Sequence, residues 1–145
     1  MPAGVWDWAL TCEGLLTVHV SWSETVVIVE MRGSVDAHTV EILCTAFDLI
    51  LARRPGRVVV DSSEVTSWSV RGLDALVGAA DHALRSGTAL AVAGFGPVHR
   101  QTIGRRWPQA DLDGIVHASV GEALLAVCAR PQPRLGVLVR RGGPR

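Results

Sequence analysis

Two aspartates in this 145-residue chain lie where predicted strands end, at positions where a polar side chain can do chemistry. Asp36 follows Gly33-Ser-Val, and Asp61 follows Val58-Val-Val. Two carboxylates at the ends of neighbouring strands are one way to build a general acid and a general base. Carboxylates at such places also accept backbone amides at the start of a helix or in a loop. We favour this capping role for both aspartates and predict no catalytic residue.

Hydroxyl side chains gather in residues 62–69, just before a segment with helical periodicity. A serine at a helix start is either presented to a kinase or accepts a helix amide as the N-cap. We favour the N-cap role for one of Ser67 and Ser69, and we expect no phosphoserine at residues 62–71. Arg71 follows, and it is either an interface anchor that pairs with an acidic partner or a solvated arginine.

The motifs of the common enzyme classes are absent from the sequence. It contains no G-x-S-x-G, no H-E-x-x-H and no G-x-G-x-x-G, and its histidines are scattered. All basic residues are arginine, so lysine-dependent chemistry is excluded. We therefore predict a protein that is not an enzyme and that has no metal site and no cofactor.

Charge is balanced overall but unevenly distributed. Fourteen acidic and fourteen basic residues cancel, so no global field favours nucleic acid or a membrane surface as a partner. Residues 129–145 contain five of the arginines and no acid, which leaves nine arginines against fourteen acids elsewhere. We interpret this segment as a flexible tail or as a partner of the acidic body.

Length and composition bound the class of protein. A chain of 145 residues with 48% hydrophobic residues suits one globular domain, and no apolar run approaches the ~18 residues of a membrane helix. Cys12, Cys44 and Cys128 are too far apart for a disulfide framework, and the first residues lack a secretory signal. These features predict a cytoplasmic protein with reduced thiols.

The order of periodic segments predicts how the polar residues are held. Alternating and β-branched runs predict a hairpin at 16–31, and later apolar runs predict buried strands at 57–60 and 88–93. Helical periodicity predicts helices after Asp36 and at 70–84, with Asp36 as the first N-cap and Val70 on the apolar face of the second. Further elements are expected as a helix from Pro97 to Gly104, a short strand at 115–117, a helix after the capping box Ser119…Glu122, and either a strand or disorder at 135–139.

Strands that alternate with helices after an initial hairpin imply an α/β fold with a mixed sheet of four to five strands and about four helices packed on it. We divide the chain into an N-terminal extension at 1–13, a domain at 14–128 and an arginine-rich tail at 129–145. Loops 33–36 and 61–72 are expected at one end of the sheet, where ligands and partners bind in such folds.

Two motifs make the domain resemble a known family. Gly33-Ser-Val-Asp36-Ala-His38-Thr39 resembles the G-x-[LV]-D-x-x-T element of STAS domains, the fold of bacterial anti-sigma factor antagonists. Val58-Val-Val-Asp61-Ser-Ser63-Glu-Val is similar to the family's strand and turn, and Gly72-Leu73 matches the start of its second helix. The resemblance covers roughly residues 15–127 and implies the STAS fold.

The resemblance also implies a switch, and here the sequence departs from the pattern. In the family a kinase that is itself an anti-sigma factor phosphorylates a serine just before the glycine of the second helix. Arg71 stands at that position, so the acceptor hydroxyl is lost, and Ser69 is only a weak substitute. The resemblance therefore implies binding without the usual phosphorylation.

The resemblance thus implies a protein-binding regulator that acts on an anti-sigma factor of the serine kinase type and controls sigma-dependent transcription. Two alternatives stay open: a scaffold or sensory subunit, stressosome-like or homodimeric through its tryptophans, and a module that binds a small ligand or nucleotide. The predicted partner-binding residues are Asp36, His38, Thr39, Asp61, Ser63, Ser69, Arg71 and Gly72.

Overall fold

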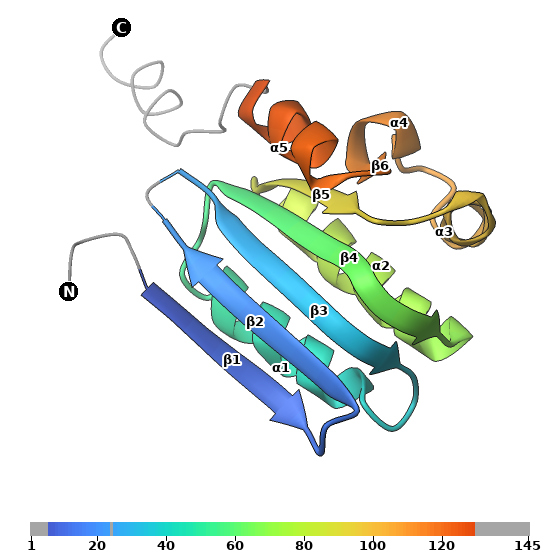
Figure 1. Ribbon diagram of the computed structural model, residues 1–145. Coiled ribbons are helices and arrows are strands. Elements are labelled where there is room, and N and C mark those ends of the chain that lie inside the picture. The colour runs from blue at the N-terminus through green and yellow to red at the C-terminus, as the bar shows by residue number, and fades with distance from the viewer. Residues whose placement is uncertain (1–5, 24, 130–145) are drawn as a thin grey trace, which may run out of the picture.

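A six-stranded sheet forms the centre of the computed structural model, which describes residues 6–23 and 25–129 (Figure 1). The strands lie in the sheet in the order in which they occur along the chain. The strands are β1 (Trp6–Cys12), β2 (Leu16–Trp22), β3 (Val27–Val35), β4 (Arg57–Trp68), β5 (Ala89–Ala93) and β6 (Val116–His117). The helices are α1 (Val40–Leu51), α2 (Val70–Arg85), α3 (Pro97–Arg106), α4 (Leu112–Ile115) and α5 (Val120–Ala129).

The sheet is mixed, as the sequence predicts. β1, β2 and β3 pair antiparallel, whereas β3, β4, β5 and β6 pair parallel through helical crossovers. In the hairpin between β2 and β3, the Ser23 hydroxyl donates to the Val26 carbonyl at 3.0 Å and accepts the Val26 amide at 3.3 Å. A small polar side chain thus closes this turn.

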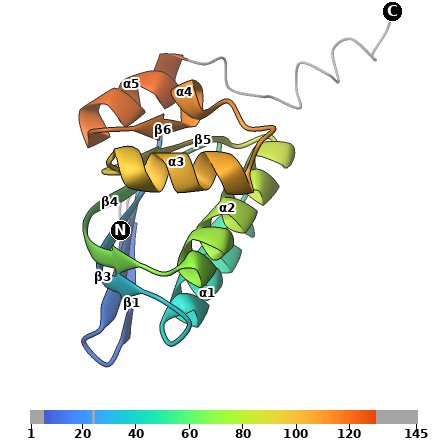
Figure 2. The ribbon, with the colours of Figure 1, turned by 90° about the vertical axis from the view of Figure 1, so that its right-hand side faces the viewer.

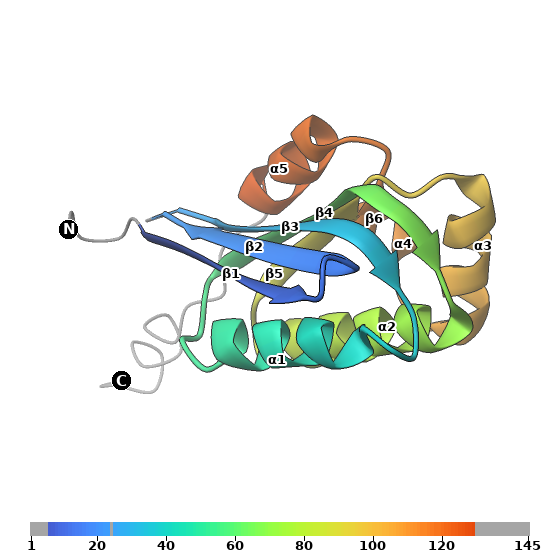
Figure 3. The ribbon, with the colours of Figure 1, turned by 60° about the horizontal axis from the view of Figure 1, so that its bottom comes forward.

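The main core lies between the sheet and the helix pair α1 and α2 (Figure 3). Alternate residues of each strand point to this face, and each buried Val, Leu or Phe side chain stabilises the fold by about 1.5–3 kcal/mol. The apolar stripe of α1 meets them with Leu43, Phe47 and Ile50, all buried. From the sheet come Leu16, Val18, Val20, Val27, Val29, Met31, Val58, Val60, Leu90 and Val92.

A smaller core lies on the opposite face of the sheet. There α5 packs Ala123 and Val127 against Val59 of β4 and the alanines of β5 (Figure 3). Because alanine has a small side chain, this helix approaches the sheet closely. Helix α4 contacts β5 and β6, and α3 contacts α2 (Figure 2). In the described chain the outer face of β1, β2 and β3 carries no helix.

The first strand of the sheet corrects the prediction for the N-terminus. The predicted extension at 1–13 contains β1, which pairs with β2 along its whole length. Trp8 and Leu10 pack against the main core, whereas Asp7, Ala9 and Thr11 are exposed, so the alternation is present. It is weak in the sequence because the outward Ala9 is apolar. The described chain therefore has six strands and five helices, slightly more than predicted.

The predicted loop at 61–72 is wrong over most of its length, because β4 continues through it to Trp68 and α2 begins at Val70. β3 likewise continues past Gly33 to Val35. The register between them shifts twice, between Glu30 and Arg32 and between Gly33 and Ser34. Each shift is a β-bulge, which re-aims side chains and hides the alternation expected of a strand.

Other boundaries differ less. The third helix runs to Arg106 instead of ending at Gly104, and the one-turn helix α4 was not predicted. The short strand predicted at 115–117 exists as β6, and the Ser119 hydroxyl accepts the Glu122 amide at 3.2 Å as expected. The possible strand at 135–139 and the arginine tail from residue 130 lie outside the described residues.

Candidate partner-binding site

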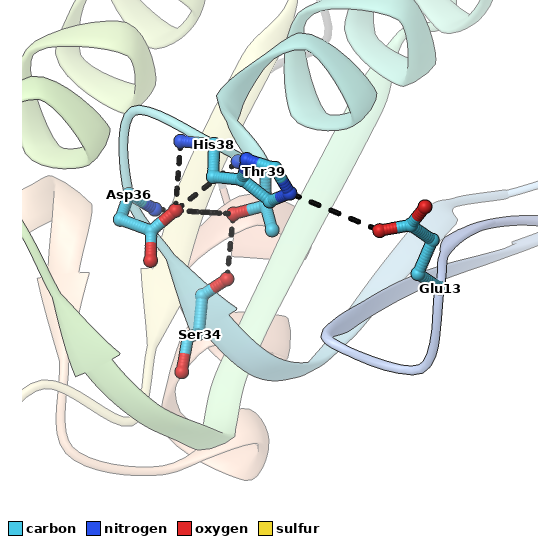
Figure 4. Close-up of polar contacts among 5 residues, drawn as sticks. All are labelled: Glu13, Ser34, Asp36, His38 and Thr39. Atoms are coloured by element: carbon cyan, nitrogen blue, oxygen red, sulfur yellow. Dashed lines mark hydrogen bonds and ion pairs between the residues drawn. The ribbon is translucent and has the colours of Figure 1, made fainter.

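The start of α1 is built around a buried threonine (Figure 4). Thr39 is only 1% exposed, and its hydroxyl donates to the Ser34 carbonyl at 2.7 Å and accepts the Asp36 amide at 3.1 Å. One Asp36 carboxylate oxygen, Oδ1, accepts the amides of His38 at 2.9 Å and of Thr39 at 3.1 Å. These bonds fix the turn that leads into the helix.

The position of Asp36 corrects its predicted role in one detail. The helix begins at Val40, so Thr39 occupies the N-cap position and Asp36 lies three residues earlier. Its carboxylate caps the turn before the helix, where aspartate side chains commonly bond to amides shortly ahead in the chain. The predicted preference for capping amides is confirmed, although the N-cap position itself is wrong.

The hairpin turn between β1 and β2 lies beside this helix start. His38 Nε2 lies 3.8 Å from Glu13 Oε1, and both side chains are largely exposed, at 67% and 78% (Figure 4). The Ser34 amide donates to the Leu15 carbonyl at 2.9 Å, and Gly33, at φ +114°, has no room for a Cβ against that residue. Sequence reasoning missed Glu13 because it is distant from the first motif along the chain and close to it only in space.

The start of α2 is locked onto the end of β3. The Ser69 hydroxyl accepts the Gly72 amide at 3.0 Å, and the Ser69 amide donates to the Val35 carbonyl at 2.9 Å. Gly72 is buried, and a Cβ there would lie 2.6 Å from the same carbonyl oxygen. Only glycine allows this close approach of helix and strand. The predicted N-cap role of Ser69 is confirmed.

Two side chains project from the first turn of α2. Val70 is 54% exposed, which corrects its predicted place on the apolar face, and Arg71 is exposed beside it. Within the residues that the structure describes, Arg71 forms no ion pair or side-chain hydrogen bond. Because the first turn of α2 has no acidic residue, this guanidinium adds to the positive end of the helix dipole. Val70 differs from the prediction because it is the first residue of the helix and lies beyond the edge of the core.

A group of hydroxyls connects the ends of β3 and β4. The Thr66 hydroxyl donates to the Gly33 carbonyl at 3.2 Å, and the Ser67 hydroxyl donates to Ser34 Oγ at 3.1 Å. These side chains sit at the second bulge and tie the two strand ends together. Ser67 is therefore not the N-cap of α2.

Asp61 and Ser63 lie away from the two helix starts. Asp61 Oδ1 accepts the Ser63 amide at 3.0 Å and the Ser63 hydroxyl at 2.5 Å, at the first bulge of β4. Asp61 is opposite Ala93 at the end of β5, and Gly94 packs against the Ser63 backbone. β4 runs on from Asp61 to Trp68 before α2 begins. A strand rises about 3.3 Å per residue, so this stretch separates the Asp61 turn from the start of α2. The structure thus brings together Asp36, His38, Thr39, Ser69, Arg71 and Gly72 but not Asp61 or Ser63.

A further ion pair joins α2 to α3. Arg106 donates to both carboxylate oxygens of Asp74, and this hydrogen bonding lowers the pKa of the Asp74 carboxyl and raises the pKa of Arg106. The pair is exposed, so it orients the two helices at little energetic gain.

Among the described residues, no three His, Cys, Asp or Glu side chains gather in a way that would hold a metal ion. In the same part of the chain, no helix combines the length and apolarity that crossing a bilayer requires.

Comparison with solved structures gives the same architecture. An anti-sigma factor antagonist from Mycobacterium paratuberculosis is 24% identical with a TM-score of 0.67, covering 82% of this chain and 99% of that one. The Bacillus cell fate determinant SpoIIAA in its phosphorylated form is 12% identical with a TM-score of 0.56, covering 82% and 96%. A variant of RsbS from Moorella thermoacetica is 16% identical with a TM-score of 0.58, covering 86% and 96%. At these identities the likeness establishes the fold.

Sequence comparison identifies the family. No curated protein matches the chain. The sequence pattern of the family described as "Mlab, STAS domain" matches residues 18–106, which contain both helix starts and the whole of β3 and β4. With the mixed sheet and the two motifs in place, the chain belongs to the STAS domain family.

Proposed function

We propose that this protein binds an anti-sigma factor of the serine kinase type and thereby controls sigma-dependent transcription in the cytoplasm. The binding site is the helix-start surface, formed by Asp36, His38, Ser69, Val70 and Arg71. Thr39 and Gly72 support it from below, being buried.

The observation that carries the proposal is the first turn of α2. An exposed valine next to an exposed arginine combines an apolar contact with a cation that can pair bidentately with a carboxylate. Arginine is enriched at the centres of protein interfaces for this reason. The family resemblance and the anti-sigma factor antagonist from Mycobacterium paratuberculosis support the class of partner.

Phosphorylation is not expected to control this binding. Arg71 has no nucleophilic oxygen, and the neighbouring Ser69 oxygen accepts the Gly72 amide. A kinase would have to break this cap before it reached the hydroxyl. Binding is therefore constitutive or is controlled in another way.

Binding to the anti-sigma factor of a neighbouring gene tests the proposal. In calorimetry, Arg71→Glu is expected to weaken binding at least tenfold, because it replaces the pairing cation with a like charge. Arg105→Glu is the matched control, since Arg105 is exposed on α3. Equal weakening by both variants, or by neither, contradicts the helix-start surface.

Phosphorylation is tested separately by intact mass after incubation with the same partner and ATP. We expect no mass increase. A stoichiometric gain of about 80 Da, the mass of one phosphoryl group, at Ser69 would contradict the constitutive part of the proposal.

One observation favours a second candidate, a homodimeric or scaffold role. Among the described strands β1 forms one edge of the sheet, and its seven residues pair with β2 alone. An unpaired edge can add a strand from a second copy. Light scattering tests this candidate by measuring the molecular mass in solution. A monomer at micromolar concentration contradicts the homodimeric or scaffold role and leaves the proposal of anti-sigma factor binding unaffected.

A further inference from the structure

The outer face of the sheet has a charge pattern that the proposed function does not use. We define the open face as the outward residues of β1, β2, β3 and the bulged part of β4. By register, Asp7 lies opposite Ser21, and Ser21 lies opposite Ile28 across the strands. Likewise Ala9, His19, Glu30 and Asp61 form a row, and Thr11, Thr17, Arg32 and Glu64 form the next.

Acidic residues dominate this face. It carries the carboxylates of Asp7, Glu30, Asp61 and Glu64 and a single arginine, Arg32. Glu30 and Asp61 are direct neighbours across β3 and β4, and like charges at such positions oppose each other. Within residues 6–23 and 25–129 none of the four carboxylates pairs with an arginine; Glu30 has only His19, at 3.5 Å. The face therefore favours a cationic ligand.

The open face is also hollowed. A recess of about 440 Å³ lies on it, lined by Ala9, Thr17, His19, Glu30 and Arg32. Two of its lining side chains, Ala9 and Thr17, are small, so an extended segment that carries both basic and apolar residues can lie along it. Such a segment brings cations to the carboxylates and apolar groups into the recess.

The same chain contains a segment of this composition. Residues 130–145 carry five arginines and no acid, interrupted by the apolar run Leu135-Gly-Val-Leu-Val139, whereas the remaining chain has five more acids than arginines. The segment follows directly after α5, which packs on the same side of the sheet as the open face.

The end of α5, which residues 130–145 follow in the sequence, lies close to the open face. Near the end of α5, the Val127 carbonyl accepts a hydrogen bond from Arg57 Nε at 3.2 Å, and Arg57 is the first residue of β4. Val58 is opposite Val27, the first residue of β3. From this corner the tail must pass β3 and β2 to reach β1, and neighbouring strands lie about 4.8 Å apart. The segment from residue 130 to residue 145 reaches up to about 53 Å when extended, which is enough to cross the face and return.

We propose that residues 130–145 bind to the open face of their own domain, with their arginines paired to Asp7, Glu30, Asp61 and Glu64. This contact lies on a different face from the helix-start surface and goes beyond the proposed function. It relieves the repulsion between Glu30 and Asp61 and covers the outward side of β1, β2 and β3.

Paramagnetic relaxation in the full-length chain tests the contact. A nitroxide is attached at Val139→Cys after Cys12, Cys44 and Cys128 are replaced by serine. We expect selective loss of amide signal at residues 17–21, 28–32 and 61–64, with the signals of α1 on the opposite face retained. About 1 M salt reduces the Debye length to about 3 Å, so it is expected to restore the lost signals. Uniform loss, or none, overturns the proposal.

Charge exchange makes the test specific. Glu30→Arg with Glu64→Arg, and Arg140→Glu with Arg141→Glu, are each expected to abolish the selective signal loss, and all four together are expected to restore it. Asp61 is kept because its carboxylate holds the Ser63 turn. A mixture of isotope-labelled wild-type chain with nitroxide-labelled chain of natural isotope abundance shows signal loss only from contacts between copies. Comparison with the singly prepared sample therefore separates contacts within one molecule from contacts between copies. Signal loss that persists in the Glu30 and Glu64 variant, or that occurs only between copies, contradicts the proposal.

Discussion

The two helix starts beside the end of β3 differ in how they use polar residues. At α1, the buried Thr39 and the Asp36 carboxylate satisfy backbone groups, and Glu41 in the first turn suits the helix dipole. At α2, one serine caps the helix, no acid follows, and Val70 and Arg71 face solvent. The polar contacts at the first start stabilise the helix end, whereas the second start leaves an apolar and a cationic group exposed, at some cost in stability.

The largest effect on the free energy of unfolding is expected at Gly72, where α2 contacts the end of β3. Gly72→Ala places a Cβ 2.6 Å from the Val35 carbonyl oxygen, so helix and strand must separate at a cost of up to about 3 kcal/mol. Gly78→Ala in the same helix has open space around it and is expected to stabilise by about 0.5–1 kcal/mol. Urea unfolding measures both, and equal effects would contradict the close approach.

The next effect concerns the start of α1. Thr39→Val keeps the volume but leaves the Ser34 carbonyl and the Asp36 amide without the hydroxyl, at an expected cost of about 2 kcal/mol. Thr45→Val on the exposed side of α1 is the control and is expected to change stability little. A Thr39 variant as stable as the control would show that the turn does not depend on this hydroxyl.

A smaller loss is expected at the start of α2. Ser69→Ala removes the N-cap bond to Gly72 and is expected to cost about 1 kcal/mol, whereas Ser69→Asp retains an acceptor and most of the stability. Thermal unfolding of the two variants makes the comparison. If both lose the same amount, the serine acts through something other than its cap.

The smallest effect has the opposite sign. Arg71→Glu replaces a cation at the positive end of α2 with an anion and is expected to stabilise the fold by about 0.3–1 kcal/mol, while weakening partner binding. Chemical denaturation of this variant, set beside its calorimetric affinity, distinguishes a binding residue from a structural one. Loss of both stability and binding would place Arg71 in the fold instead.

Sequence reasoning reached the fold because its signals are local. The stripe of α1 and the alternation of Leu16, Val18 and Val20 come from single elements, and each matches the core that forms. The Ser69 cap was predictable for the same reason, since a capping serine bonds to an amide of the next helical turn.

The errors come from features that depend on neighbours. Residues 62–67 are polar except for Val65 and do not alternate, yet pairing with an extended β3 holds them in a strand through two bulges. That pairing also carries Asp61 and Ser63 away from the helix starts. Glu13 reaches His38 only because the β1–β2 turn folds beside α1, which no spacing in the sequence indicates.

The strand order of the sheet, identical to the order along the chain, has a consequence for biosynthesis. As the polypeptide leaves the ribosome, each new strand finds its neighbour already present, so the sheet can grow from one side without waiting for a distant segment. Until the last strand is added, the incomplete sheet therefore has an exposed edge with unpaired backbone groups. The last strand, β6, is only two residues long, so the completed sheet has a short edge on this side. Co-translational folding in this protein is therefore expected to proceed as stepwise addition, with the nascent edge as its most aggregation-prone feature.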